Sequence, residues 1–342
     1  MTKASINILH HPLIFKKPAR TSRDVLTQKP SWFIKIETEE GFGIGECSII
    51  PGLNPESTED AEMMLKKLQG VNNLENIDLP EAHRFPSVRF AIETALRSLA
   101  AKNPMVLFES DFTENNAGIP INGLVWMDNI PAMREQMKER VEQGYDVVKL
   151  KIGALDFDQE CDLLDWFRNE YGFTYELRLD ANGAFTPAEA LRKIERLAQF
   201  DIHSIEQPIK SGQIKEMREL VKHSDIAIAL DEELIGIADY TALLDEIAPQ
   251  FMILKPSLIG GWEVCDNLIK LAQERNINWW ATSALESNIG LNAIAQWCAT
   301  QELTLPQGLG TGSLYTNNIP SPLSIERGHL YSDQTKWTLP WD

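Results

Sequence analysis

The sequence predicts an α/β protein in which a barrel of parallel strands follows a smaller α+β module. Short apolar strands alternate with helices from about residue 119 onward, whereas the first hundred residues lack this alternation. Charged residues close several of the strands, with gaps of 29, 26, 25 and 24 residues between Lys151, Asp180, Glu206, Asp231 and Lys255. Each gap accommodates one strand and one helix, as in a barrel whose strand ends meet at one rim. We therefore expect a TIM-type barrel of seven or eight βα units that follows an α+β module.

The N-terminal module is expected to be a small sheet followed by helices. Its predicted strands are 5–9, 32–37 and 42–46, and its predicted helices lie near 58–69 and 86–102. A basic, Pro-containing stretch at 16–30 and a Pro- and Gly-containing stretch at 48–57 are predicted to be loops. The predicted domains are this α+β module at 1–105, the barrel at 106–312 and a C-terminal tail at 313–342 that packs back on the module.

The barrel is expected to contain eight strands, of which the last has the weakest pattern. The predicted strands are 120–126, 146–151, 176–180, 203–206, 226–231, 250–255, 277–281 and 303–307. The clearest helix spans 186–200, where Thr186 and Glu189 form a capping box and Pro187 suits the first turn. An open doubly wound sheet is the alternative, but no GxGxxG motif follows the first strands.

Composition narrows the class of protein. The chain has 342 residues and a net charge of −18, which argues against nucleic acid and anionic membrane surfaces as partners. Its four cysteines form no CxxC pair, and no apolar run approaches the ~20 residues of a membrane span. With no secretory signal in view, a cytoplasmic enzyme is expected. The oligomeric state is not indicated by the sequence.

Three acids at consecutive strand ends suggest a metal site. Asp180, Glu206 and Asp231 would point inward at the rim, where clustered negative charge is costly without a cation. Oxygen ligands favour a hard divalent ion, so we expect Mg²⁺, with Mn²⁺ as a substitute. The alternative is that each acid only caps the helix that follows it.

Three lysines accompany the acids. Lys149 and Lys151 lie two residues apart on one strand and share a face, and Lys255 would stand across the site. A free lysine has a pKa of ~10.4, but a neighbouring ammonium group and a divalent cation both favour its neutral form. We expect Lys151 to be a general base that Lys149 tunes, although two solvated lysines are the alternative. Such a site suits proton abstraction next to a small-molecule carboxylate.

Several further residues are weaker candidates for contacts with the substrate or the metal ligands, and each could instead have only a structural role. Arg178 shares a strand face with Asp180, and Asn182 is either an outer partner of the metal ligands or a turn residue. Ser283 is a candidate substrate contact, whereas Glu286 is expected only to cap a helix. The backbone of Gly308 and Gly310 is a candidate anion contact or simply a flexible loop. Arg20 and Arg23, in the first predicted loop, are candidate carboxylate contacts or merely solvated.

The motif set resembles the enolase superfamily, in its muconate-lactonising branch. The matching motifs are KLK at 149–151, LDAN at 179–182, EQP at 206–208, DE at 231–232, KP at 255–256 and GFGIGEC at 41–47. The resemblance covers nearly the whole chain. It implies a modified TIM barrel of the (β/α)7β type with an α+β capping domain at 1–105, whose two loops close over the barrel mouth. It also implies a Mg²⁺ ion held by the three acids.

Within that branch, the stretches RLDAN at 178–182, SALESNIGL at 283–291 and QGLGTGSLY at 307–315 resemble the group that makes o-succinylbenzoate. The resemblance implies dehydration of 2-succinyl-6-hydroxy-2,4-cyclohexadiene-1-carboxylate in menaquinone biosynthesis. Lys151 would remove the α-proton, and Lys255 would stabilise a metal-bound enediolate. An N-acylamino-acid racemase or a dipeptide epimerase on the same scaffold is the alternative, although LPQGLG at 305–310 lacks the acids of the epimerases. A non-catalytic barrel is a further alternative.

Overall fold

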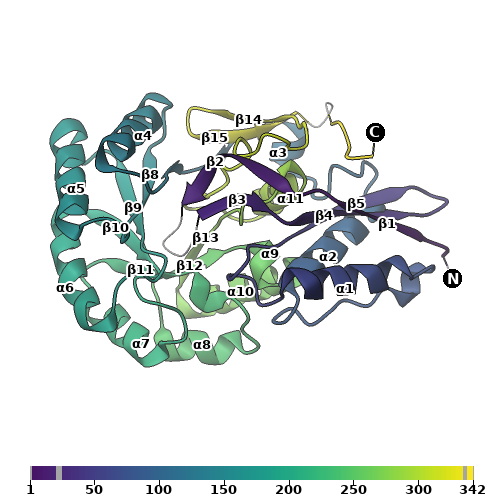
Figure 1. Cartoon of the computed structure of the whole chain (residues 1–342), viewed down its shortest axis with the longest axis horizontal. Coiled ribbons are helices and arrows are strands. Elements are labelled where there is room, and N and C mark those ends of the chain that lie inside the picture. Colours follow the sequence, from purple (N-terminus) through teal and green to yellow (C-terminus); the bar gives the residue numbers. More distant parts are fainter. Residues whose placement is uncertain (1, 21–24, 334–336, 342) are drawn as a thin grey trace.

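The computed structural model describes residues 2–20, 25–333 and 337–341. A parallel barrel and a smaller antiparallel sheet with two helices lie side by side, and a hairpin lies between them (Figure 1). Within the described residues, no helix has both the length and the apolar character that a membrane span requires.

The smaller sheet has the order β1 (Ser5–His10), β4 (Ser31–Glu37), β5 (Phe42–Ser48), with both pairings antiparallel. The helices α1 (Thr58–Gln69) and α2 (Pro86–Ala100) pack on it, and Ile34, Leu65 and Val88 belong to their shared core. A short helix, η1 (Leu74–Asn76), joins the two. The helices and the 48–57 loop agree with the sequence prediction.

The predicted loop at 16–30 is wrong, because this stretch contributes to a β-hairpin. Strands β2 (Leu13–Arg20) and β3 (Val25–Lys29) pair antiparallel, and residues 21–24 between them lie outside the described part. One side of the hairpin packs on the barrel through Leu13, Phe15 and Ala19, while the other leaves residues such as Ile14 exposed. The strands were missed because lysines, an arginine and a proline interrupt their apolar alternation.

Seven parallel strands form the barrel sheet in chain order: β7 (Gly123–Val125), β8 (Val147–Lys151), β9 (Glu176–Asp180), β10 (Ile202–Glu206), β11 (Ala227–Leu230), β12 (Phe251–Leu254) and β13 (Asn278–Ala281). The connecting helices are α4 (Ile130–Glu142), α5 (Phe157–Tyr171), α6 (Pro187–Leu197), η2 (Ala198–Phe200), α7 (Ile214–His223), η3 (Glu232–Leu234), α8 (Tyr240–Ile247), α9 (Pro256–Ile259) and α10 (Trp262–Arg275). Helix α11 (Asn288–Ala299) follows β13. The capping box of α6 is present as predicted.

The eighth strand is shorter than predicted. Instead of a strand over 303–307, Gln307 bridges to Ile121 and Gly308 bridges to Thr282, both in parallel register. These two residues therefore connect the two edges of the sheet, next to β7 and β13. The stretch before them cannot extend the pairing at Pro306, which lacks a backbone N–H.

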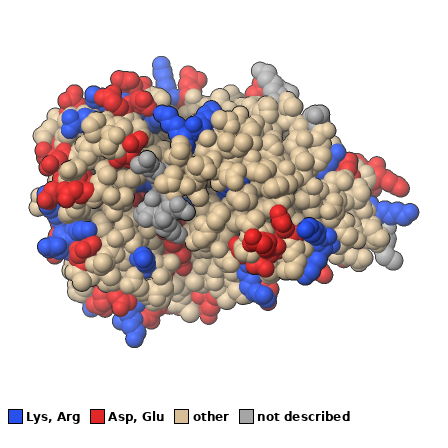
Figure 2. All heavy atoms as spheres, viewed as in Figure 1, with Lys and Arg blue, Asp and Glu red and all other residues tan. Residues whose placement is uncertain are grey.

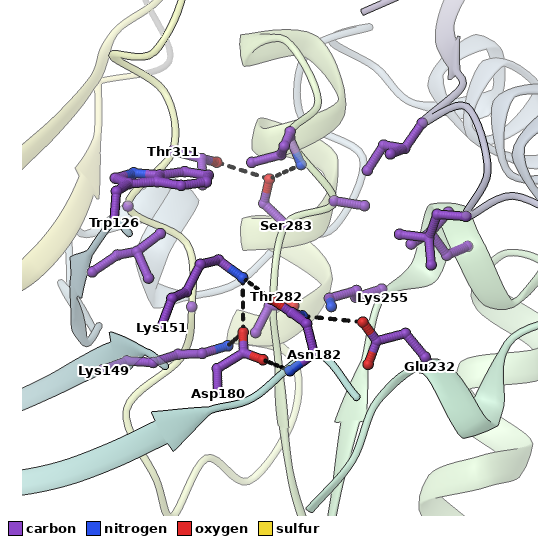
Figure 3. Close-up of a pocket in the computed structure, with 18 of the residues that line it drawn as sticks. Trp126, Lys149, Lys151, Asp180, Asn182, Glu232, Lys255, Thr282, Ser283 and Thr311 are labelled. Atoms are coloured by element: carbon purple, nitrogen blue, oxygen red, sulfur yellow. Dashed lines mark hydrogen bonds and ion pairs between the residues drawn. The ribbon is translucent and has the colours of Figure 1, made fainter. Parts of the chain in front are cut away.

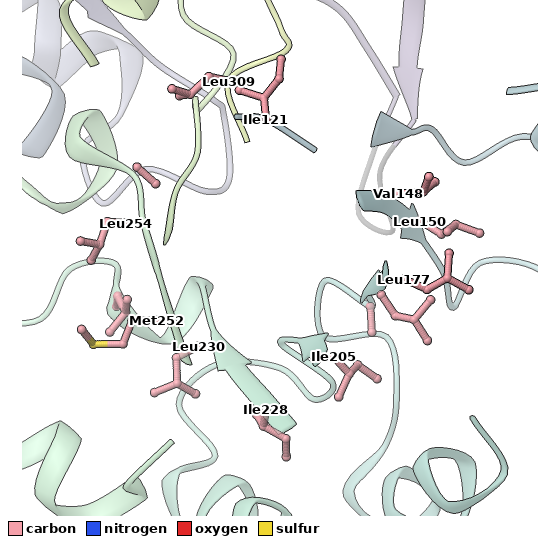
Figure 4. Packing of buried hydrophobic residues seen from close by; sticks show 14 of the residues in the cluster. Ile121, Val148, Leu150, Leu177, Ile205, Ile228, Leu230, Met252, Leu254 and Leu309 are labelled. Carbon is pink, nitrogen blue, oxygen red and sulfur yellow. The ribbon is translucent and has the colours of Figure 1, made fainter. Parts of the chain in front are cut away.

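Alternation along the strands separates the two faces of the barrel sheet. The outward side chains join one large buried cluster with the helices. Those labelled in Figure 4 are Ile121, Val148, Leu150, Leu177, Ile205, Ile228, Leu230, Met252, Leu254 and Leu309. The residues between them point to the barrel interior. Lys149, Arg178, Glu206 and Asp231 are among these inward residues, and all four are buried.

The C-terminal segment contacts both parts of the molecule. Strands β14 (Leu323–Glu326) and β15 (His329–Ser332) form an antiparallel pair, and β15 also pairs with β6 (Ile119–Pro120), near the short helix α3 (Asp111–Glu114). Farther along, Trp337, Leu339 and Trp341 pack against the cluster that contains Phe33 and Ile44 of the capping sheet. We retain the three predicted domain ranges as a proposal.

Candidate active site

Three of the charged strand-end residues, Lys151, Asp180 and Lys255, meet at one pocket at the mouth of the barrel (Figure 3). The barrel side of the pocket wall includes Lys149, Lys151, Asp180, Asn182, Glu232, Lys255, Thr282, Ser283, Gly308, Gly310 and Thr311. The capping hairpin and the 48–57 loop contribute Leu26, Ile50, Pro51 and Leu53. Charged groups on one side and apolar side chains on the other suit a small organic acid.

Lysine amines bridge the three acids. Lys149 Nζ lies 3.0 Å from Asp180 Oδ2 and donates a 2.6 Å hydrogen bond to Glu206 Oε2. Lys255 Nζ donates to Asp231 Oδ2 and lies 3.9 Å from Glu206 Oε1. The acids on β9, β10 and after β11 are therefore neighbours, as their strand spacing predicts. Glu206 and Asp231 are 2% exposed and do not line the pocket themselves.

Burial and opposite charge act against each other in this cluster. Burial opposes ionisation of Asp180, but Lys149, Lys151 and Lys255 lower its pKa below the ordinary value. Burial also opposes the charged form of Lys149, yet the nearby Asp180 and Glu206 raise its pKa. Burial, reinforced by the charge on Asp180, raises the pKa of Glu206 to about 8. Burial is thus the main cause of the raised pKa of Glu206, whereas the nearby amines keep Asp180 ionised.

The acids fit a divalent cation by chemistry, although the lysines occupy the space between them here. Within the ranges that the structure describes, no three acidic, histidine or cysteine side chains are already arranged as a coordination group. However, Glu206 Oε1 is buried and accepts no hydrogen bond from any described residue. A buried carboxylate oxygen without a donor is costly, and an oxygen-only set of three acids suits a hard cation.

Lys151 is held beside the acids by two oxygen acceptors. Its Nζ donates to Asp180 Oδ2 at 3.0 Å and to Asn182 Oδ1 at 2.6 Å. Asn182 Nδ2 in turn donates to Glu232 Oε1 at 3.0 Å. Asn182 therefore contacts the predicted base directly. It also has a left-handed backbone with φ 44°, as turn residues often do, and its role beside the metal ligands stays a prediction.

The residues after β13 and at the closing strand also reach the pocket. Ser283 Oγ donates to Glu286 Oε2 at 2.7 Å and accepts from Thr311 Oγ1 at 2.8 Å. Gly308 lies so close to the barrel wall that an added Cβ would be 2.5 Å from Thr282 Cγ2. Gly310 lines the pocket without such crowding. Sequence reasoning gave Glu286 only a capping role, whereas here it fixes the Ser283 side chain.

Arg178 does not line the pocket. Its guanidinium lies inside the barrel, 4.3 Å from the ring centre of Trp280, and donates to Glu176 Oε1 at 2.7 Å and to the Pro306 carbonyl at 2.8 Å. Burial lowers its pKa, and Glu176 opposes that effect. Arg178 therefore fills the interior of the barrel beneath the acids. The side chain of Arg20, and the whole of Arg23, lie outside the described residues.

Some pocket residues were not identified from the sequence. Trp126 follows β7, and its ring centre lies 5.9 Å from Lys151 Nζ. Glu232 directly follows Asp231, and the sequence analysis named it only as part of the DE motif at 231–232. Lys29 does not line the pocket itself, but it is buried at the end of β3 and bonds to Ala284 and Leu285, which do. Nothing in the sequence distinguished it, because its strand was predicted to be a loop.

Comparisons with known proteins agree with this arrangement. The sequence model of the family described as Enolase C-terminal domain-like matches residues 132–335. The o-succinylbenzoate synthase of Desulfotalea psychrophila (strain LSv54) is 44% identical, over 96% of this chain and 99% of that protein. The chain belongs to the enolase superfamily.

A solved structure and a second curated protein are also similar to this chain. The crystal structure of MenC from Desulfotalea psychrophila LSv54 matches with a TM-score of 0.87 and 41% identity, over 96% of this chain and 100% of that one. An N-succinylamino acid racemase from Amycolatopsis sp is 24% identical, over 92% of this chain and 88% of that protein. The predicted modified barrel with a capping domain is thereby confirmed, and enzymes of this superfamily depend on a divalent metal ion.

Proposed function

We propose that this chain is a hydro-lyase that converts 2-succinyl-6-hydroxy-2,4-cyclohexadiene-1-carboxylate to o-succinylbenzoate, a step of menaquinone biosynthesis. The observation that carries the proposal is the placement of Lys151 and Lys255 on opposite sides of one pocket, beside three buried acids. The 44% identical relative that is named for this product supports the choice of substrate.

In the proposed reaction, Lys151 performs both proton transfers. Its amine takes the α-proton from the ring carbon that bears the carboxylate. The resulting ammonium group then protonates the hydroxyl that leaves from the adjacent carbon, so that water departs and the ring becomes aromatic. Lys255, across the pocket, places positive charge beside the electron-rich ring during this step.

Mg²⁺ is the proposed cofactor, with Mn²⁺ as a substitute, and Asp180, Glu206 and Asp231 are its proposed ligands. When bound, the ion would stabilise negative charge that develops on the substrate carboxylate. Lys149, between Asp180 and Glu206, would keep its ammonium beside that of Lys151. The four cysteines are buried and unpaired, which supports the predicted cytoplasmic location.

Racemisation of N-succinylamino acids is the second candidate function. The observation that favours it is again the pair of amines on two sides of the pocket, since removing and returning a proton on opposite faces inverts a stereocentre. It would require both Lys151 and Lys255 to exchange protons, whereas dehydration needs only one base.

An ultraviolet assay with both substrate classes separates the two candidates. With Mg²⁺ and the cyclohexadiene substrate, we expect the absorbance of the aromatic product to appear. N-succinylamino acids in deuterated water should show slower exchange of the α-hydrogen than this turnover. Absence of aromatic product, together with rapid exchange and inversion of an N-succinylamino acid, would replace the lyase with the racemase.

A further inference from the structure

Leu285 has an unusual backbone conformation at the pocket wall. Its φ is 62°, in the left-handed region that leucine rarely adopts because Cβ approaches the following carbonyl oxygen. Among the residues that line the pocket, Asn182 shares this property, but asparagine tolerates it far better. Such strain persists only where surrounding contacts hold it, and it gathers at functional sites.

The contacts that hold Leu285 come from three directions. Its carbonyl oxygen accepts hydrogen bonds from Lys29 Nζ at 3.0 Å and from Tyr315 Oη at 2.6 Å. Its N–H donates to Ser283 Oγ at 2.9 Å. The preceding residue, Ala284, donates to Glu286 Oε2 at 2.8 Å, and its carbonyl accepts from Lys29 Nζ at 2.5 Å. Both backbone polar groups of Leu285 are therefore fixed.

Lys29 links this wall to the capping hairpin. It ends β3, is 1% exposed, and uses its ammonium on the Ala284 and Leu285 carbonyls and on Ser48 Oγ at 2.8 Å. A buried ammonium group needs such acceptors, because leaving water without them is very costly. Two of its three hydrogen bonds go to the carbonyl groups of Ala284 and Leu285, in the loop between β13 and α11. These bonds join the hairpin to that loop.

Leu285 belongs to the wall of the pocket. It lines the pocket together with Leu26 of the hairpin, Trp126 and Lys151. It also packs against the apolar cluster of Leu13, Phe15, Ala19 and Tyr315, which joins the hairpin to the barrel. In an ordinary backbone conformation, the side chain would leave this position.

We propose that Leu285 is a specificity-determining residue, and that Lys29 and Tyr315 are positioning residues that hold its left-handed backbone. The side chain contacts the apolar body of the carboxylate substrate, away from the carbon that loses its proton. This inference rests on the proposed function for the identity of the substrate, but the strained backbone and its contacts do not depend on it.

Two substitutions at one position test the proposal. Leu285→Ala and Leu285→Gly both remove the side chain, so both should raise KM by about tenfold or more while kcat changes little, as expected for a lost leucine contact. Only glycine relieves the backbone, so Leu285→Gly should unfold at a higher temperature than Leu285→Ala, the reverse of their order at ordinary positions. Unchanged KM in both variants, or the ordinary order of unfolding temperatures, would overturn the proposal.

The positioning residues are tested separately. Tyr315→Phe removes one hydroxyl and keeps the ring, and Lys29→Met removes the ammonium group; each should raise KM more than it lowers kcat. Lys66→Met, on an exposed part of α1, is the matched control and should leave both constants unchanged. If Lys29→Met fails to fold, Tyr315→Phe alone decides, and wild-type KM in that variant contradicts the positioning role.

The result for the unaltered chain keeps this inference distinct from the proposed function. If the wild-type chain shows no dehydratase turnover, the proposed function is contradicted. The order of unfolding temperatures of the two Leu285 variants still tests whether the backbone of residue 285 is held in its left-handed conformation. A wild-type chain with turnover whose Leu285 variants keep its KM contradicts the inference alone.

Discussion

Lys151 has the contacts expected of a base whose amine is fixed in place. Asp180 and Asn182 accept its hydrogen bonds, and Lys149 contacts the same Asp180 oxygen. The two ammonium groups at this oxygen both stabilise the ionised carboxylate, and together with Lys255 they lower the pKa of Asp180. The two lysines of the KLK stretch therefore act on the same acid from one face of their strand.

Replacement of Lys151 by alanine should therefore remove catalysis but leave the fold intact. We expect Lys151→Ala to lower kcat by at least about 10²-fold, the lower range for a general base. Turnover is followed by product absorbance, and the fold by circular dichroism. Lys270→Ala, at an exposed position on α10, is the control. Residual activity within tenfold of wild type would refute the role of Lys151 as the base.

Asp231 tests the proposed ligand set. Asp231→Asn keeps the size of the side chain but removes its charge, so Mg²⁺ affinity should fall by more than about tenfold. The measurement is a calorimetric titration of the metal-free protein. Asp162→Asn, at an exposed position on α5, should leave the affinity unchanged. Equal affinities for Asp231→Asn and wild type would remove Asp231 from the ligand set.

At the scale of elements, strand β5 and helix α2 approach each other unusually closely. A Cβ at Gly45 would lie 2.0 Å from the Ala91 carbonyl oxygen, and one at Gly43 would lie 2.0 Å from that of Ala95. The contact is made by backbone atoms, which cannot turn aside as a flexible side chain would. The glycines of the GFGIGEC motif therefore permit the helix to pack on the sheet. That sheet also supports Glu46, whose carboxylate accepts from the N-terminal turn of α11.

A methyl group at this contact should destabilise the molecule. Gly45→Ala is expected to lower the free energy of unfolding by about 1–3 kcal/mol, because overpacking displaces the helix from the strand. Chemical denaturation measures the change. Gly70→Ala is the matched control, since its added Cβ would meet only one atom, at 3.4 Å, and its φ of −78° suits alanine. A loss no greater at Gly45 than at Gly70 would show that the strand and helix can move apart at little cost.

At the scale of the whole molecule, the sequence predicted the barrel well and the capping hairpin poorly. Strand β9 has the predicted bounds, and the other barrel strands differ by a few residues, because buried parallel strands with charged ends give a strong pattern. The hairpin was missed because its packing depends on barrel residues far away in the sequence. The length of the closing strand was overestimated. Its apolar residues do not reveal that only two of its positions pair, Gln307 with Ile121 and Gly308 with Thr282.

The candidate site was predictable to a similar degree. Regular strand spacing brings the acids and lysines to one rim, where the structure has them as neighbours. The contacts of Leu285 and Lys29 were not predictable, because a left-handed leucine and a buried lysine have no distinguishing sequence pattern.

On the face shown in Figure 2, acidic and basic side chains are interspersed, and a broad central area is largely uncharged.

Three buried acids are proposed to hold one divalent ion, and turnover is proposed to depend on that ion. Titration of the metal-free chain with Mn²⁺, with bound ions counted by electron paramagnetic resonance and activity measured on the same samples, tests it most directly. We expect one tightly bound ion per chain, turnover in proportion to its occupancy, and an unfolding temperature that rises as the ion binds. Full turnover by the chain stripped of divalent ions would contradict the claim.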